Sequence, residues 1–183
     1  LSVTASGAVR GTSGGGITAF NSATAGALTI SAAAVSGATD AVYAVNSGTG
    51  ALSVTTTGTV SGTGTNGRGI AAFNSSTGTS LTISAAAVSG NLDGIRADNS
   101  GTGALTVTAT GAVNGTTRHG ILAFNARTAG TSLTIAAAAV TGRTEGIRAD
   151  NSGTGALSVT TTGDVTGTTS DGILAINSSA GTS

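Results

Sequence analysis

The stretch GIRADNSGTG at residues 94–103 occurs again, unchanged, at residues 146–155. Likewise LSVTTTGTVSG at 52–62 is matched by LTVTATGAVNG at 105–115. Aligned on these matches, the chain consists of seven units of about 26 residues with the form L-x-[V/I]-x…V-x-G…[G/A]-[I/V]-x-A-x-N. Fixed periods of about 20 to 50 residues are typical of solenoids, propellers and other repeat arrays. The repeat predicts one continuous stack, because each unit can bury its apolar face only against its neighbours.

Inward and outward residues alternate within each unit, as Leu28 and Ile30 or Ile95 and Ala97 illustrate. Period two is typical of a β-strand with one buried face, and no longer window has the spacing of an amphipathic helix. Glycines and the cluster Asn-Ser-Gly-Thr-Gly interrupt the strands as turns. Three short strands and three corners per unit predict an all-β fold. We expect a right-handed parallel β-helix (β-solenoid) of seven triangular rungs.

Successive units differ in length, so the full repeat is a pair of rungs of about 52 residues. Between the leucine and the first valine, every odd-numbered unit has one extra residue, accounted for by Gly7, Gly58, Gly111 or Gly163. Even-numbered units run through alanines instead. We expect a bulge or a left-handed corner at these glycines. The pattern predicts a single β-solenoid domain over residues 1–183, excerpted from a longer repeat chain because it begins inside a repeat.

Composition excludes several classes of function. The formal net charge is zero, and the seven basic residues are all arginines. They form no basic patch, and aromatic residues are too few to stack on bases, so nucleic acid is not an expected partner. The apolar runs are too short to span a bilayer. The chain contains no cysteine, which excludes a disulfide framework.

An asparagine ends the last strand of every unit. We expect these side chains to form an inward amide ladder, in which each hydrogen-bonds the next and satisfies corner backbone groups. The alternative is that they are ordinary asparagines in left-handed turns. The predicted ladder consists of Asn21, Asn46, Asn74, Asn99, Asn125, Asn151 and Asn177.

A column of charged residues lies two positions before the isoleucine or valine that opens the last strand of each unit after the first, where Gly15 stands. Stacked one rung apart, acids alternate with arginine and histidine, so Asp93, His119 and Glu145 are expected neighbours. One interpretation is an acid–base or metal site. The favoured one is a surface charge ladder that fixes register, since no nucleophile accompanies it. We therefore expect no catalytic residue, metal or cofactor. The column consists of Asp40, Arg68, Asp93, His119, Glu145 and Asp171.

The outward positions of the last strand of each unit carry all three phenylalanines and the only tyrosine. An apolar stripe of this kind is typical of an interface, although its side chains can also simply pack on one another across rungs. Arginine–aspartate pairs interrupt the stripe, and their stems can cover neighbouring rings. The candidate interaction face consists of Phe20, Tyr43, Phe73, Arg96, Asp98, Leu122, Phe124, Arg148, Asp150 and Ile176.

The repeat motif L-x-V-x-x-x-G-x-V-x-G…G-I-x-A-x-N-S resembles the Gly/Ser/Thr/Ala-rich repeats in passenger regions of bacterial autotransporters and related large surface adhesins. The resemblance covers all seven units. It implies a secreted, extracellular β-helix on a bacterial cell surface, attached to the membrane only through a barrel domain outside this sequence. We expect a structural rod or fibre with a role in adhesion or lateral assembly. Its partners would be other copies of itself, or host or cell-surface glycans and proteins.

Two alternatives remain. Outward Ser and Thr residues on the first strand of each unit, such as Thr106 and Thr108, are similar to the flat face of ice-binding solenoids. Carbohydrate-binding or carbohydrate-cleaving β-helices share the coil, but they need acidic clusters in a groove built by long loops. The corners of this chain are short and its acids are few, so an enzyme is not expected.

Overall fold

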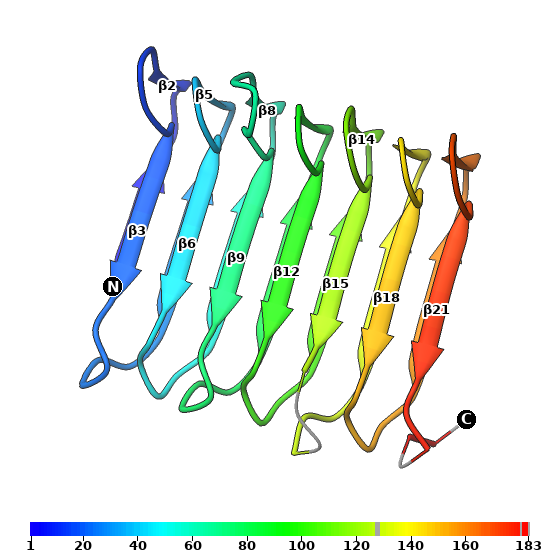
Figure 1. Ribbon diagram of the computed structural model, residues 1–183. Coiled ribbons are helices and arrows are strands. Elements are labelled where there is room, and N and C mark those ends of the chain that lie inside the picture. Colours follow the sequence, from blue (N-terminus) through cyan, green and yellow to red (C-terminus); the bar gives the residue numbers. More distant parts are fainter. Residues whose placement is uncertain (127–128, 180, 183) are drawn as a thin grey trace.

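The computed structural model describes residues 1–126, 129–179 and 181–182, which form twenty-one β-strands and no helix. The strands wind around one axis as seven rungs, numbered here from the N-terminal end, with one strand from each of three sheets in every rung (Figure 1). The chain rises behind the front sheet, crosses the top and descends in front while advancing from blue to red, so the coil is right-handed. The predicted parallel β-helix is confirmed.

Each sheet contains seven parallel strands, stacked in rung order. The strands of the first sheet are β1 (Ser2–Ala5), β4 (Leu28–Ala32), β7 (Leu52–Thr56), β10 (Leu81–Ala85), β13 (Leu105–Ala109), β16 (Leu133–Ala137) and β19 (Leu157–Thr161). The shorter strands of the second sheet are β2 (Val9–Gly11), β5 (Val35–Gly37), β8 (Val60–Gly62), β11 (Val88–Gly90), β14 (Val113–Gly115), β17 (Val140–Gly142) and β20 (Val165–Gly167). The strands of the third sheet, in front in Figure 1, are β3 (Ile17–Asn21), β6 (Val42–Asn46), β9 (Ile70–Asn74), β12 (Ile95–Asn99), β15 (Ile121–Asn125), β18 (Ile147–Asn151) and β21 (Ile173–Asn177).

The register places identical or similar inward residues above one another in successive rungs. Leu81 pairs with Leu105 in the first sheet, and Ala97 pairs with Ala123 in the third. These inward side chains form one continuous aliphatic core along the axis. Ala97 and Ala123 have no exposed surface, so a larger side chain in this narrow interior would overpack it. No described segment forms a helix long and apolar enough to cross a bilayer.

The extra residue of the odd rungs lies in the corner between the first and second strands, but the expected left-handed conformation is wrong. No described residue has a positive φ. In rungs 5 and 7 glycine is favoured there because of a close approach instead. A Cβ built on Gly111 would lie 2.9 Å from the backbone nitrogen of Ala87 in the preceding rung, and one on Gly163 would lie 3.0 Å from that of Ala139.

Candidate functional site

The asparagine side chains at the end of the third sheet form a continuous hydrogen-bonded ladder. Each Nδ2 donates to the Oδ1 of the asparagine in the next rung, over distances of 2.8 to 3.0 Å from Asn21 to Asn177. Each Nδ2 also donates to a carbonyl of its own corner, as Asn99 does to Gly103 at 3.0 Å. Asn99 is fully buried, and its polar atoms are satisfied by these bonds. The ladder therefore holds rungs together and offers no free group to a ligand.

The charged column lies at the corner where the second sheet leads into the third, and the expectation that it is a surface ladder is wrong for its middle. The side chain of Asp93 has no exposed surface and that of His119 is 8% exposed. His119 Nδ1 lies 2.9 Å from Asp93 Oδ1, and His119 Nε2 lies 3.2 Å from Glu145 Oε2. Asp93 and His119 lie in the corners that precede β12 and β15, and the charged side chains of the neighbouring rungs enclose them there.

Asp93 is the centre of this cluster. It accepts hydrogen bonds from the backbone nitrogen of His119 at 3.2 Å and from Arg68 Nε at 3.4 Å, and Arg118 Nη1 lies 4.0 Å from its second oxygen. Burial by itself raises the pKa of Asp93. The hydrogen bonds from His119 and the charge of Arg118 more than offset this effect, so the pKa lies below its ordinary value. Asp93 is thus held as a buried carboxylate.

The cluster continues toward the N-terminal end through Arg68. Its backbone nitrogen donates to Asp40 Oδ1 at 2.7 Å, and its guanidinium lies 3.5 Å from Asp40 Oδ2. The sequence prediction did not include Arg118 in the column, because Arg118 precedes His119 and reaches Asp93 only through the rung stacking. Within the described ranges no three His, Cys, Asp or Glu side chains are grouped so that they could hold a metal ion.

The outer face of the third sheet, here called the stripe face, brings three of the four predicted aromatic residues into contact. The ring centroids of Phe20 and Tyr43 are 5.7 Å apart, and those of Tyr43 and Phe73 are also 5.7 Å apart. Exposure along the stripe is uneven: Phe20 is 64% exposed, whereas Leu122 is 3% exposed. Packing across rungs therefore covers part of the stripe. The expectation that Leu122 is exposed is wrong, because it is buried between the arginines of the flanking rungs.

Two arginine–aspartate pairs lie on the same face, two rungs apart. Arg96 donates to Asp98 Oδ2 from Nε at 3.0 Å and from Nη2 at 2.9 Å. Arg148 Nε donates to Asp150 Oδ2 at 3.0 Å. Each guanidinium also covers a phenylalanine of the preceding rung, Arg96 at 5.3 Å from the Phe73 ring centroid and Arg148 at 5.6 Å from that of Phe124. These are cation–π distances, and they fix the arginines flat against the face.

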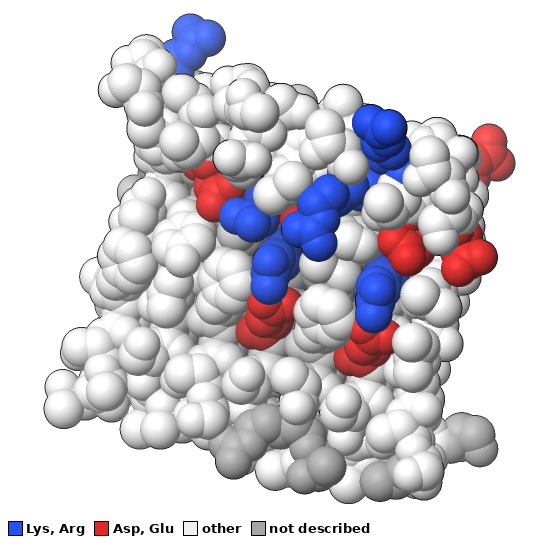
Figure 2. All heavy atoms as spheres, viewed as in Figure 1, with Lys and Arg blue, Asp and Glu red and all other residues white. Residues whose placement is uncertain are grey.

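Each aspartate of these pairs keeps one oxygen without a partner. Oδ1 of Asp98 and Oδ1 of Asp150 are buried and accept no hydrogen bond. Burial raises the pKa of Asp98 above its ordinary value, although the charge and hydrogen bond of Arg96 oppose the shift. Figure 2 shows that charged side chains gather on this face, over its middle and C-terminal strands.

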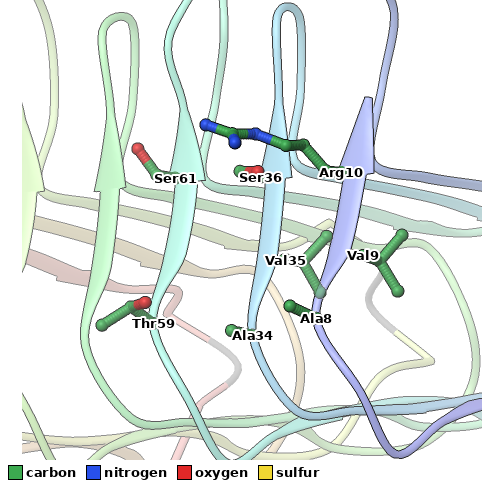
Figure 3. Close-up of a pocket in the computed structure, with 8 residues that line it drawn as sticks. All are labelled: Ala8, Val9, Arg10, Ala34, Val35, Ser36, Thr59 and Ser61. Carbon is green, nitrogen blue, oxygen red and sulfur yellow. The ribbon is translucent and has the colours of Figure 1, made fainter. Parts of the chain in front are cut away.

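The hollows of the surface are shallow. One lies outside the second sheet and is lined by small side chains, among them Ala8, Ala34 and Ser36. Figure 3 shows Arg10 extended across Ser36 toward Ser61 on this surface. One guanidinium over a floor of alanines and serines provides no convergent set of polar groups, so the stripe face remains the candidate interaction site.

No protein-family model matches the chain, and neither a curated protein nor a solved structure matches it. Its function is therefore inferred from the geometry of its surface and from the pattern of its repeats.

Proposed function

We propose that this chain is part of a secreted or cell-surface β-solenoid rod that acts as a structural and adhesive element, on a bacterial surface or in an extracellular fibre. The uniform stacking of seven rungs supports a mechanical role, because stability is distributed along the axis through nearest-neighbour contacts. The resemblance of the repeats to autotransporter passengers and large adhesins supports the location. The stripe face is the proposed contact surface.

One observation carries this proposal: the outer face of the third sheet differs chemically from that of the first sheet. The third sheet bears both aromatic contacts and both arginine–aspartate pairs. The first sheet presents small hydroxyl side chains, such as Thr82 and Ser84 in β10 and Thr106 and Thr108 in β13. A single apolar and charged face on an otherwise uniform rod is typical of an interaction surface.

A catalytic role is less well supported by the one candidate cluster. Both ring nitrogens of His119 face carboxylates of adjacent rungs, and Asp93 is fully buried. A general acid or base must reach the substrate within hydrogen-bonding distance. These side chains instead stabilise the stacking of rungs, and we propose that the chain is not an enzyme.

Bead adhesion tests the proposed contact role. Beads that carry the chain by one end are mixed with one another and with surfaces coated with cell-surface glycans or proteins. We expect wild-type beads to cluster or to be captured, and beads with Tyr43→Ser, Phe73→Ser and Phe124→Ser to lose this adhesion. The control variant carries Ser53→Ala, Thr82→Ala and Thr106→Ala on the first sheet and should adhere like the wild type. Equal adhesion of both variants, or no adhesion of the wild type, contradicts the proposal.

A second candidate, ice binding, is supported by the register of the first sheet. Thr82 lies beside Thr106, and Ser84 beside Thr108, so hydroxyl side chains form straight rows across rungs. Thermal hysteresis of the purified chain is the measurement that decides it. Its presence, and its loss in the first-sheet control variant, would favour ice binding over adhesion.

A further inference from the structure

The stripe face consists of two outward columns, which are complementary to each other rung by rung. The first column, nearer the start of each strand, contains Thr18, Tyr43, Ala71, Arg96, Leu122, Arg148 and Leu174. The second column contains Phe20, Val45, Phe73, Asp98, Phe124, Asp150 and Ile176. A cation in one column is matched by an anion in the other, and four aromatic residues are each matched by a smaller one.

Two symmetry operations can place a second copy of this face against the first. A two-fold axis parallel to the strands keeps each column opposite itself and reverses the order of the rungs. Arginine then never lies opposite aspartate. A two-fold axis parallel to the solenoid axis, passing between the columns, keeps each rung opposite the same rung and exchanges the columns. Arg96 then faces the partner's Asp98, and Arg148 faces the partner's Asp150.

Resting on the proposed contact role of the stripe face, we propose that its occupant is a second copy of this chain, bound side by side, parallel and in rung register. Phe73 faces the partner's Ala71 in this arrangement, and Tyr43 faces the partner's Val45, so large side chains meet small ones. Such a two-fold contact is self-complementary, as an isologous interface requires.

The state of the aspartates supports this arrangement. Each aspartate is compensated by one arginine of its own chain, and burial still disfavours the charge of Asp98 there. The partner's arginine adds a positive charge opposite each carboxylate, and a buried charge is stable only when it is well compensated. The facing copies of rung 4, and likewise those of rung 6, then contain two arginines and two aspartates in alternation, with no like charges directly opposed.

The size of the face determines how strong the contact is. Strands about 4.8 Å apart and residues about 3.3 Å apart give five-residue strands in seven rungs a face of roughly 34 by 16 Å. Two copies would bury about 1,000 Å² in total, which is near the lower limit for a specific interface. The contact is therefore weak for seven rungs and grows in proportion to the number of rungs.

Complementary charge variants test the pairing. The acidic variant carries Arg96→Asp and Arg148→Asp, and the basic variant carries Asp98→Arg and Asp150→Arg. Sedimentation equilibrium at low salt should show weak self-association of the wild type. Each variant alone should associate at least about tenfold more weakly than the wild type, because like charges then face each other. An equimolar mixture of the two variants should associate as strongly as the wild type. Self-association of either variant at wild-type strength overturns the proposal, as does a wild type that stays monomeric at millimolar concentration.

A third variant is the control that separates a loss of pairing from a loss of folding. It carries all four substitutions, so rungs 4 and 6 each keep one arginine and one aspartate in exchanged columns. It should fold by circular dichroism and associate with itself like the wild type. Failure of this folded variant to associate overturns the column pairing.

Cross-linking tests the direction of the partner. Facing sheets lie about 10 Å apart, so a short bis-maleimide is used instead of a disulfide. Chains with Tyr43→Cys should cross-link to chains with Val45→Cys in the same rung. Cross-linking of Tyr43→Cys to Arg148→Cys indicates reversed rung order and overturns the proposal. Beads captured by foreign surfaces without self-association would leave the adhesive role intact and remove only this inference.

Discussion

At the scale of single residues, the buried Asp93 carboxylate has three charged partners, more than any other charged side chain described. It contacts Arg68 in the preceding rung and Arg118 and His119 in the following one, and His119 continues to Glu145. Breaking such a buried network by removing one partner is strongly destabilising, because the remaining charges lose their compensation. Exposed ion pairs contribute much less.

Asp93→Asn should lower the free energy of unfolding by about 3 kcal/mol at neutral pH. The folded-state pKa of Asp93 lies below its ordinary value of 3.8, so its contribution to stability is complete above that value and is lost as pH falls through the folded-state pKa. Guanidinium unfolding of wild type and variant between pH 7 and about pH 2 measures this. The difference between them should shrink on acidification. The exposed Asp164→Asn is the control and should have little effect. A difference that is constant with pH would contradict the argument.

At the scale of structural elements, the corners after the first-sheet strands alternate in length between odd and even rungs, and packing between these corners explains the alternation. In odd rungs the corner is one residue longer and contains a glycine. From rung 3 onward, this glycine lies against the alanine-containing corner of the even rung before it. Gly58 approaches Ala34, and Gly111 approaches Ala87. The alternation is thus a matter of packing between neighbouring corners rather than of backbone handedness.

Gly111→Ala should destabilise the fold by about 1 to 3 kcal/mol, because its Cβ would lie 2.9 Å from a backbone nitrogen that cannot move freely. Gly7 is the matched control, since it occupies the same corner in rung 1 and no atom lies within 4 Å of a Cβ built there. Gly7→Ala should be neutral or slightly stabilising. Thermal unfolding of both variants measures the effect, and equal shifts in Tm would show that the corner contact is unimportant.

At the scale of the whole molecule, stability is the sum of similar rungs and their nearest-neighbour contacts. Strand pairing occurs only between adjacent rungs, in all three sheets. The pair of rungs is the unit that preserves these contacts, because an odd corner packs on an even one.

Removal of residues 105–156, which are rungs 5 and 6, should leave a five-rung chain that folds cooperatively, with an m-value reduced in proportion to its length. Removal of residues 133–156 alone keeps six rungs but places odd rung 5 beside odd rung 7. We expect this longer chain to be no more stable than the five-rung chain. Guanidinium titration compares them, and a stability that rises with rung number regardless of parity would contradict pairwise packing.

The sequence by itself determined the coil, the sheet register and the two-rung unit, because periodic burial of Leu, Ile, Val and Ala leaves one self-consistent way to stack. It also placed Asp93, His119 and Glu145 in one column, and the aromatic and Arg–Asp positions on one face. Only the tertiary structure decided which of these are exposed. Leu122 is covered by side chains from its neighbouring rungs, and Asp93 is enclosed at a corner by Arg68, Arg118 and His119. The burial of a side chain depends on atoms in the adjacent rung, which are about 26 residues away in the sequence. The alternation of residues along a strand therefore predicts which way a side chain points, but not how much of its surface is exposed.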